Sequence, residues 1–475
     1  MGRIFAIFLF LNFSLPLAKA QPGAAFCLES PFLTGFQKAC TDLEGNLYVS
    51  GYFQRQLTLG GTSFWADRGA YFLAKYRPDF TLVWARQLTA PPRDLAWSGA
   101  QLLVLGQFQQ ALYLDKDTLR SAGGFDAFVA ALDAETGQYR WYRHLSATRD
   151  VLAQALSTDP EGNIYLTGGF EGNFSLGGHS LERDLFKNAY LIKLNAQGLC
   201  QWATRLSGGH NPLTGVFVRS LAFDAQGFLW LGGNLCGAGR FDQKMIYSST
   251  EQYFAEGRVY NHDIFVACYQ PDGILRWVKT LAQNADLQVL LPDHQGHLYL
   301  AGHFQGSTNL NRPQQLGMAK FGRQSLKAAL GASQHPVEDS FLAKINALGH
   351  YEWLKHGQGT ANNRAIALAY DASQGQVWLG GMFQQSLSLA ESNWQAEAGP
   401  HHQQDLYWIG LDSKGTLRAG GQFGGPGNDQ LTALLMAPGP VLYLIGRQVR
   451  ADGTANGFIL NGQKASEARP EAQKP

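Results

Sequence analysis

Charged residues are scarce in this sequence, and neither sign dominates. Only 16% of the 475 residues are charged, and 38 Lys and Arg stand against 37 Asp and Glu. No run of five like charges occurs. A partner that is bound through a strong positive patch, such as a nucleic acid or an anionic membrane surface, is therefore not expected.

Long apolar runs are also missing, except at the N-terminus. Residues 1–20 carry one basic residue (Arg3), an apolar run from Ile4 to about Leu17, and the small-x-small site Ala18-Lys19-Ala20. This pattern is typical of a secretory signal peptide and is too short for a spanning helix. We expect export to the periplasm, the cell surface or the medium, with no transmembrane segment after cleavage.

Cysteine is sparse, with five residues at positions 27, 40, 200, 236 and 268. No CxxC spacing suggests zinc or redox chemistry. Since these cysteines fall in strand-like segments, they are expected to be small buried hydrophobic residues, although one disulfide stays possible.

Motifs for catalysis and for metals are lacking as well. We find no nucleophile elbow G-x-S-x-G, no P-loop, no H-E-x-x-H and no G-x-G-x-x-G. His294, His297 and His303 are close in sequence but belong to different local structures, and the run from Asp115 to Asp126 lacks the dense D-x-D-x-D-G spacing of a calcium loop. No catalytic residue, metal or cofactor is therefore predicted.

What the sequence has is glycine, with 55 residues, and aromatic residues at 12%. This composition favours many short strands joined by tight turns, and so an all-β fold. One phrase recurs, for example DPEGNIYLTGGF at residues 159–170. Aligned on the Gly after its β-run, the phrase occurs seven times, at Gly51, Gly106, Gly168, Gly233, Gly302, Gly381 and Gly446.

The residues around this Gly follow the two-residue period of a strand. An aromatic residue stands three positions before it in six of the seven copies, and Phe or Leu stands two positions after it in six. Five copies begin with Asp three or four residues before a second Gly, as in Asp159 and Gly162. This is the chemistry of a tight turn between two strands.

Three further strands are expected in each copy. An apolar strand precedes the Asp turn, a run such as DAFVAAL (126–132) follows the phrase, and a strand carrying a Trp, such as Trp202, comes next. Seven four-stranded antiparallel units predict a seven-bladed β-propeller over residues 21–463, followed by a disordered tail, 464–475. The last copy lacks its Trp strand, so we expect residues 24–30, with Phe26 in place of the Trp, to close the ring.

These motifs carry a resemblance to a known family. The phrase D-x-x-G-N-x-Y-x-x-G-x-F at residues 42–53 and 159–170, followed by D-x-F-[VL]-A and by G-x-x-x-W, resembles the SBBP-type β-propeller repeats of secreted bacterial proteins. The resemblance implies a secreted seven-bladed propeller. It implies no single activity, because similar repeats occur in many surface and secreted proteins.

The copies differ most in the connection between their second and third strands. It is longest at residues 236–262 and 305–338. Since these connections emerge on one face of a propeller, we predict a binding face there, although the loops could instead have drifted in length without function. Large aromatic and basic residues suit recognition, and the candidates in these connections are Trp65, Tyr247, Tyr253, Phe254, Arg258, Arg312, Trp394 and His401.

Three function classes follow from this pattern. The first is a monomeric, exported, non-catalytic protein that binds an extracellular or envelope protein or a glycan through the long connections. The second is a polysaccharide hydrolase or lyase acting on the same face, which predicts clustered acids or histidines near the axis. The third is a structural scaffold.

Overall fold

The computed structural model describes residues 24–462 except 29, 31, 183–187, 209–213, 250, 255–256, 261, 308–312, 332–334, 397–403, 426, 440 and 450–454. The signal peptide and the tail predicted from the sequence lie outside these residues. The described part is all-β apart from one 3-10 turn, η1 (Pro313–Gln315).

Seven four-stranded antiparallel blades form the protein, as the repeat predicts. From inner to outer strand they are β2 (Thr34–Thr41), β3 (Leu47–Leu59), β4 (Thr62–Tyr76), β5 (Leu82–Leu88); β6 (Pro92–Ser98), β7 (Gln101–Tyr113), β8 (Thr118–Asp133), β9 (Tyr139–Ala147); β10 (Val151–Thr158), β11 (Ile164–Phe170), β14 (Asn188–Leu194), β15 (Cys200–Ser207); β16 (Gly215–Phe223), β17 (Leu229–Cys236), β22 (Asp263–Tyr269), β23 (Leu275–Gln283); β24 (Asp286–Pro292), β25 (Leu298–Phe304), β28 (Asp339–Ile345), β29 (Tyr351–Gly359); β30 (Asn363–Asp371), β31 (Gln376–Gln384), β34 (Gln404–Leu411), β35 (Leu417–Phe423); and β36 (Gln430–Ala437), β37 (Val441–Val449), β38 (Ala455–Asn461), β1 (Ala24–Cys27). We number these blades 1 to 7.

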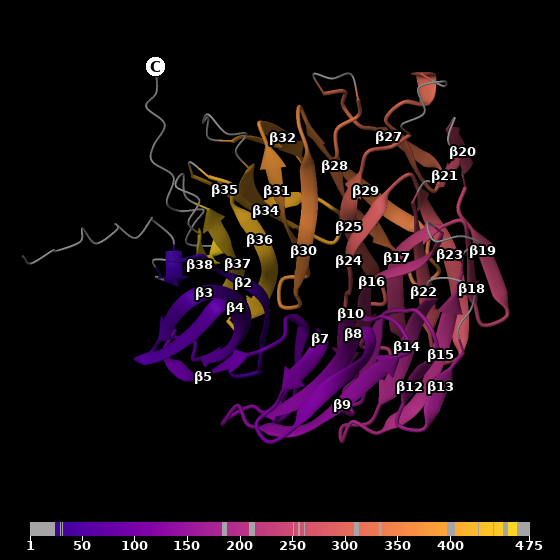
Figure 1. The fold of residues 1–475 in the computed structure, drawn as a ribbon. Coiled ribbons are helices and arrows are strands. Elements are labelled where there is room, and N and C mark those ends of the chain that lie inside the picture. The colour runs from indigo at the N-terminus through magenta and orange to yellow at the C-terminus, as the bar shows by residue number, and fades with distance from the viewer. Residues whose placement is uncertain are drawn as a thin grey trace, which may run out of the picture.

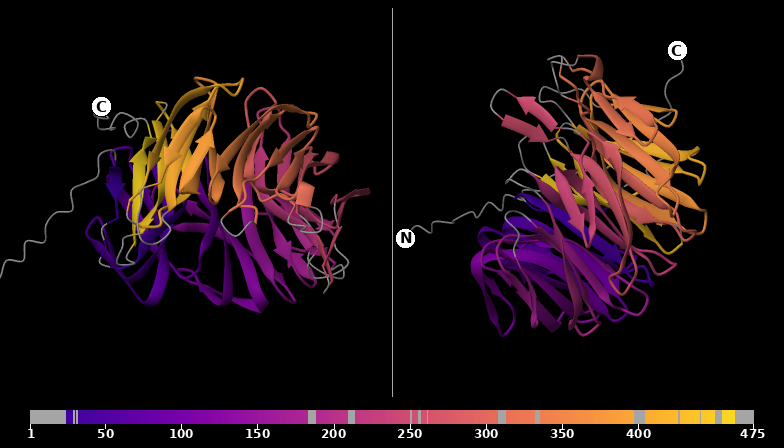
Figure 2. Two further views of the ribbon diagram at one scale, coloured as in Figure 1. Left: turned by 90° about the horizontal axis from the view of Figure 1, so that it is seen from above. Right: turned by 90° about the vertical axis from the view of Figure 1, so that its right-hand side faces the viewer.

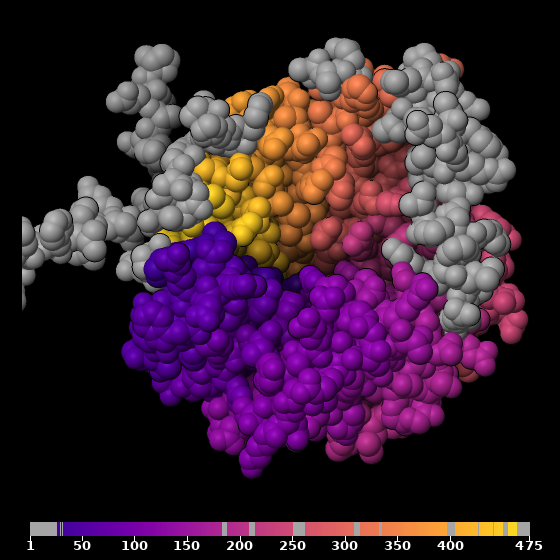
Figure 3. Space-filling model, viewed as in Figure 1, coloured from indigo at the N-terminus to yellow at the C-terminus, as the bar shows by residue number. Residues whose placement is uncertain are grey.

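The blades stand in a ring around one axis. Each inner strand contacts the inner strands of both neighbouring blades, and β2 of blade 1 contacts β36 of blade 7. Figure 1 shows the yellow blade 7 beside the indigo blade 1, and both views of Figure 2 agree. In the space-filling view the atoms of these two blades lie directly against each other (Figure 3).

An N-terminal strand closes the ring. β1 pairs antiparallel with β38, with Phe26 opposite Ile459, and so completes blade 7 as expected. The Phe26 ring lies 5.1 Å from the Tyr76 ring and stacks 5.8 Å from Phe80 in blade 1. Phe26 therefore makes an inter-blade contact like the one that a Trp makes in blades 1 to 5.

The hydrophobic core is divided among the blade interfaces. Seven buried clusters lie within the described residues, one between each pair of neighbouring blades. The strand-b aromatics predicted to fill these interfaces do so: Tyr48, Tyr165 and Tyr299 have no exposed surface, and Trp230 has 1%. A single blade cannot bury both of its faces, so each depends on its neighbours.

In blades 1, 3 and 4 the Asp of the turn between the first two strands holds both the turn and the aromatic. Asp159 accepts hydrogen bonds from the Asn163 backbone N–H at 2.8 Å and from the Tyr165 hydroxyl at 3.0 Å. Asp224 accepts in the same way from the Trp230 indole N–H at 2.6 Å. These carboxylates are therefore structural, because their acceptor sites are taken by the local fold.

In blades 1 to 5 a Trp of the outer strand ties the blade to the next one. The Trp202 indole N–H donates to the Pro271 carbonyl at 3.3 Å, and its ring covers Gly273, where a Cβ would meet it at 3.0 Å. Gly273 has φ +89°. Trp84, Trp141, Trp277 and Trp353 repeat the arrangement over Gly137, Gly198, Gly349 and Gly415. These Trp rings are half-buried.

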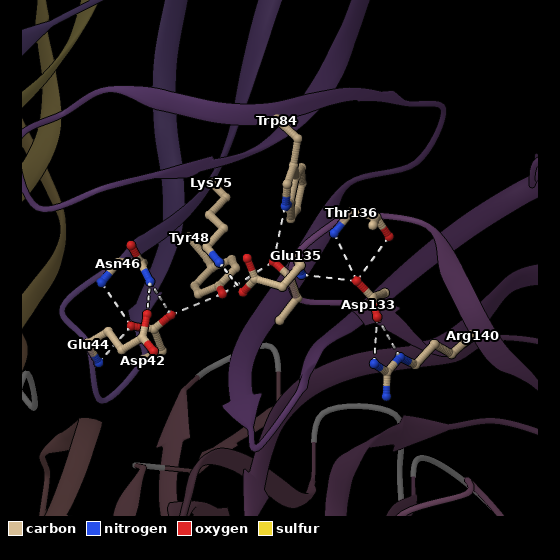
Figure 4. Close-up of polar contacts among 11 residues, drawn as sticks. Asp42, Glu44, Asn46, Tyr48, Lys75, Trp84, Asp133, Glu135, Thr136 and Arg140 are labelled. Atoms are coloured by element: carbon tan, nitrogen blue, oxygen red, sulfur yellow. Dashed lines mark hydrogen bonds and ion pairs between the residues drawn. The ribbon is translucent and has the colours of Figure 1, made fainter.

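Figure 4 shows the junction of blades 1 and 2. The Lys75 side chain is almost fully buried, and its ammonium group forms an ion pair with Glu135 of the next blade at 2.6 Å. The same ammonium lies over the Tyr48 ring, and the Tyr48 hydroxyl donates to Asp42 at 3.1 Å. Trp84 donates to the Ala134 carbonyl at 3.1 Å beside them. The turns thus join neighbouring blades on one face of the ring, which we call the turn face.

The opposite face, which we call the loop face, carries the connections between strands b and c and between successive blades. Several of these long connections are hairpins that extend a neighbouring sheet, which corrects their interpretation as free loops. In each hairpin the first strand pairs with the outer strand of a blade and the second strand pairs with the first. The hairpins are β12 (Phe174–Leu176) and β13 (His179–Leu181) beside β9; β18 (Ala238–Phe241) and β19 (Lys244–Tyr247) beside β15; β26 (Met318–Phe321) and β27 (Gln324–Lys327) beside β23; and β32 (Ser386–Leu389) and β33 (Ser392–Gln395) beside β29.

Each of these hairpins therefore adds to the outer edge of the blade before its own. One apolar side chain anchors each hairpin, because Phe174, Phe241, Phe321 and Leu387 are at most 1% exposed. Much of the length variation among the copies thus has a structural role. Only β20 (Glu251–Phe254) and β21 (Gly257–Tyr260), within the described strands, form a hairpin that joins no blade.

Candidate functional site

Every inner strand contains a β-bulge, and this bulge shapes the axial end of the loop face. The register with strand b shifts by one residue in all seven blades, for example between Val218 and Ser220 in blade 4. The extra residues are Gln37, Arg93, Gln154, Arg219, Gln288, Ile366 and Thr432. Bulges re-aim side chains, and none of these seven is fully buried.

The bulge explains the Gly on which the sequence repeat aligns. Gly168 pairs with Ala153 beside the bulge of blade 3, and a Cβ at Gly168 would collide with the Leu152 carbonyl oxygen. The same collision with an inner-strand carbonyl would occur at Gly51, Gly106, Gly233, Gly302, Gly381 and Gly446. Glycine is therefore required by the close approach of two backbones.

The side chains next to the bulge and the repeat Gly differ from blade to blade, and several of those in blades 4 and 5 are polar. Asp286 begins β24, and its carboxylate accepts hydrogen bonds from the Asn234 amide at 2.6 Å and the His262 imidazole at 2.9 Å. The Asn234 carbonyl oxygen in turn accepts the Leu287 N–H at 2.9 Å. Asp286 of blade 5 is therefore fixed by two side chains of blade 4.

A second ion pair lies beside the first. Arg364 of β30 forms a two-pronged pair with Glu338, which precedes β28, and its Nη2 atom lies 2.6 Å from the carboxylate. His303 pairs with Asp286 in the strand register. Its buried Nδ1 atom has no hydrogen-bond partner among the described residues. We call Arg219, His262, Asp286, His303, Glu338 and Arg364 the axial cluster.

The two histidines of the axial cluster are shifted in opposite directions. The hydrogen bond to Asp286 raises the pKa of His262 above its usual value. Burial lowers the pKa of His303, against the opposing effect of Glu338 and Asp286. Burial would raise the pKa of Asp286, but the bond from His262 and the nearby cations outweigh it and lower that pKa. The surroundings thus favour the charged form of His262 and the neutral form of His303.

A pocket of about 330 Å³ adjoins the axial cluster between blades 3 and 4. It is lined by the start of β10, the end of β11 and the start of β16, and Arg219 belongs to both the pocket and the cluster. Its other lining side chains include Leu152, Gln154, Glu171 and Phe217. We call it the axial pocket.

The residues predicted from the sequence do not converge on this site. Trp65 and Tyr247 are exposed, at 65% each, and lie on hairpins. Trp394 is only 3% exposed and stacks 5.9 Å from Tyr407 in the core between blades 5 and 6, which corrects the expectation of an exposed ring. Its strand alternates, so that Trp394 faces inward while its neighbours face solvent.

The remaining predicted residues are not placed. Tyr253, Phe254 and Arg258 fall in β20 and β21, but their side chains lie outside the described part of the structure. Arg312 and His401 are not among the described residues. The axial cluster itself escaped the sequence analysis, which considered His303 only together with His294 and His297. The residue directly after each repeat Gly could have indicated this cluster, because it is polar in blades 4 and 5 (Asn234 and His303) but is Gly169 in blade 3.

In the described ranges, no three His, Cys, Asp or Glu side chains are arranged so that they could hold a metal ion. The same ranges contain no helix with the length and apolarity needed to cross a membrane.

No family model and no curated protein matches the chain. Solved structures are similar in fold. BamB from Moraxella catarrhalis is 11% identical, with 90% of this chain and 85% of that chain covered and a TM-score of 0.37. Sqt1 from Saccharomyces cerevisiae is 10% identical, with 95% and 93% covered and a TM-score of 0.37. Hydrazine synthase from Kuenenia stuttgartiensis is 8% identical, with 91% and 97% covered and a TM-score of 0.43. Function is therefore inferred from this chain's own residues.

Proposed function

We propose that this chain is an exported, non-catalytic binding protein whose loop face recognises a protein or a glycan in the cell envelope or outside the cell. One observation carries the proposal. The seven blades repeat their core and turn residues, yet at the axial end of the loop face equivalent positions hold different side chains, such as Leu152, Phe217, Asp286 and Arg364. In repeat proteins, the residues that bind a partner usually lie at the positions that differ from repeat to repeat.

Binding explains the charged groups of this face better than hydrolysis does. Glycoside hydrolysis needs one carboxyl group whose pKa is raised, so that it can act as an acid, and a second ionised carboxylate. Asp286 is bonded to His262 and Asn234 and has a lowered pKa. Glu338 is bonded through both carboxylate oxygens to Arg364. Neither carboxyl group is thus prepared to donate a proton.

A lyase acting on polysaccharide is the second candidate, and one observation favours it. Burial lowers the pKa of His303, Arg364 and Arg219 lower it further, and its Nδ1 atom has no partner among the described residues. A neutral imidazole is a competent general base. This candidate predicts an unsaturated product, which is detectable by its ultraviolet absorbance, and loss of that product in His303→Gln.

The proposed function is tested by affinity capture from envelope and culture-medium fractions, followed by identification and quantification of the bound material. The loop-face variant combines Trp65→Ala, Tyr247→Ala and Arg364→Ala. We expect it to lose the partner that the wild-type chain captures. Shortening the hairpins is avoided, because β18 and β26 complete the outer edges of blades 3 and 4.

A matched control alters the turn face. Leu43, Leu199 and Leu348 are exposed by 80%, 55% and 60% and lie at turn tips, so their replacement by Ala leaves the fold and the loop face intact. Loss of the partner in this control, with retention in the loop-face variant, would place recognition on the opposite face and refute the proposal.

A further inference from the structure

The floor of the axial pocket is apolar, although it lies at a solvent-exposed end of the ring. Leu152 is 44% exposed, and Phe217 is half-buried beside it in the next blade. The equivalent residues in blades 1, 2, 5, 6 and 7 are Gly35, Pro91, Asp286, Arg364 and Gln430. Blades 3 and 4 are therefore the neighbours that place two large apolar side chains together at this position.

The rim of the pocket is polar, and its side chains have unused hydrogen-bonding capacity. Gln154 and Arg219 are the bulge residues of blades 3 and 4, and Glu171 follows β11. None of these three side chains has a hydrogen bond or an ion pair within the described part of the chain. Asp150, also on the rim, is already engaged, because its carboxylate accepts the Phe125 N–H at 2.8 Å.

These three free groups complement one another chemically. Arg219 offers only donors, the Glu171 carboxylate only acceptors, and the Gln154 amide both. The charges of Arg219 and Glu171 cancel, and Asp150 adds a further carboxylate to the rim, so an anionic ligand would meet like charges in the pocket. A ligand with several hydroxyl groups uses donors and acceptors at once, and an apolar ring face suits the Phe217 and Leu152 floor.

The size of the pocket limits the ligand further. At about 330 Å³ it lies at the small end of ligand-binding cavities. A protein surface would instead need an interface of about 1,200 Å² or more. The pocket thus fits one or two rings of a small polar molecule.

We propose that the axial pocket binds a neutral hexose-type sugar ring. This inference rests on the proposed function and identifies a glycan as the ligand of the loop face. Phe217 and Leu152 contact the apolar face of the ring, and Arg219, Glu171 and Gln154 hydrogen-bond to its hydroxyl groups. The neighbouring ion pairs of the axial cluster keep the rim rigid, since Asp286 and Glu338 are both held in place.

The test uses the whole mature chain and defined probes. Glucose, galactose, mannose and N-acetylglucosamine are offered as free monosaccharides and as immobilised oligosaccharides. Glucuronate is the comparator with a net charge, and triglycine is the peptide comparator. We expect at least one neutral sugar to bind, and Arg219→Ala to weaken that binding at least tenfold. Stronger binding of the oligosaccharide than of the monosaccharide identifies a glycan chain as the source; equal binding identifies a free sugar.

Arg93→Ala is the matched control. Arg93 is the bulge residue of blade 2, is exposed like Arg219, and does not line the pocket, so its replacement should leave sugar binding unchanged. Phe217→Ala is the second test variant and should also weaken binding tenfold. Thermal unfolding of each variant confirms that it is folded.

Each contrary result has its own meaning. Preference for glucuronate or triglycine, or a wild-type affinity in both Arg219→Ala and Phe217→Ala, would overturn the sugar assignment. If no neutral sugar binds while the loop face still captures an envelope partner, the sugar assignment fails and the proposed function stands. If sugars bind in the pocket but the loop-face variant captures every partner normally, the pocket stands and the wider recognition surface is wrong.

Discussion

The indole ring of Trp202 in blade 3 lies over Gly273 in the turn of blade 4 and donates its N–H to the Pro271 carbonyl at 3.3 Å. This contact joins two blades through one side chain and one backbone turn. The same contact joins each of blades 1 to 5 to the next blade, so it stabilises five successive blade interfaces on the turn face.

Replacing Trp202 by Ala should therefore destabilise the protein. The ring is half-buried, so we expect a loss of about 2 to 3 kcal/mol, below the range for fully buried Trp residues. Denaturant unfolding measures this change. Trp65→Ala is the control, because Trp65 is 65% exposed and its loss should cost under about 0.5 kcal/mol. Equal effects of the two replacements would count against the inter-blade link.

Two adjacent glycines allow a sharp test of the bulge. Gly168→Ala puts a Cβ against the Leu152 carbonyl, whereas the atom closest to a Cβ at Gly169 is 3.7 Å away. We expect Gly168→Ala to cost about 1 to 3 kcal/mol and Gly169→Ala to be nearly neutral. Thermal unfolding of the pair decides the matter, and a larger loss at Gly169 would show that the bulge does not dictate the repeat Gly.

The closing strand should depend on Phe26. Phe26→Ala removes the rings' contacts with Tyr76 and Phe80, and we expect a lower melting temperature, as from a loss of about 2 kcal/mol. Cys27→Ala is the neighbouring control, because Cys27 is exposed. Removal of residues 21–32 should have a larger effect than Phe26→Ala. A truncated chain that melts like the wild type would exclude this strand as the closure of the ring.

The two axial histidines should titrate on opposite sides of the usual value of about 6.5. The His262 pKa is raised by its bond to Asp286, so its contribution to stability is present at low pH and is lost as the pH rises through the native pKa. The His303 pKa is lowered by burial, so its contribution is present above the unfolded value and is lost as the pH falls.

NMR titration of the imidazole signals checks this prediction, with His262→Gln and His303→Gln to assign them. A His303 midpoint above that of His262 would contradict the arrangement described here. His303→Gln should also reduce the loss of folding stability on acidification below pH 6.5, whereas His262→Gln should not.

The blades were predictable from the sequence because their determinants are local. The Asp turn, the buried aromatic and the Trp strand each depend on residues a few positions apart, and their repetition fixes the number of copies. The N-terminal closure was predictable for the same reason, since a strand was missing from the last copy and Phe26 was available near the start.

The hairpins and the axial cluster were not predictable in this way. β12 and β13 are three-residue strands whose partner β9 belongs to another blade, and so short a pattern does not indicate its neighbour. Asp286, Glu338 and Arg364 are separated by large stretches of chain and come together only because blades 5 and 6 pack side by side. The burial of Trp394 could not be predicted, because a strand of only four residues is too short for the sequence to indicate which of its faces is buried.

The pairing of Ala24 with Leu460 has a consequence for how the molecule is made. This contact joins the beginning and the end of the chain, so it can form only after every intermediate blade has been synthesised and the longest possible loop has been closed. Contacts between residues so far apart slow folding. Until that moment, blade 7 exposes the outer edge of β38 and blade 1 lacks its neighbour, and an unpaired edge of this kind invites association between chains. Ring closure is therefore the step at which a newly made molecule is most exposed to aggregation.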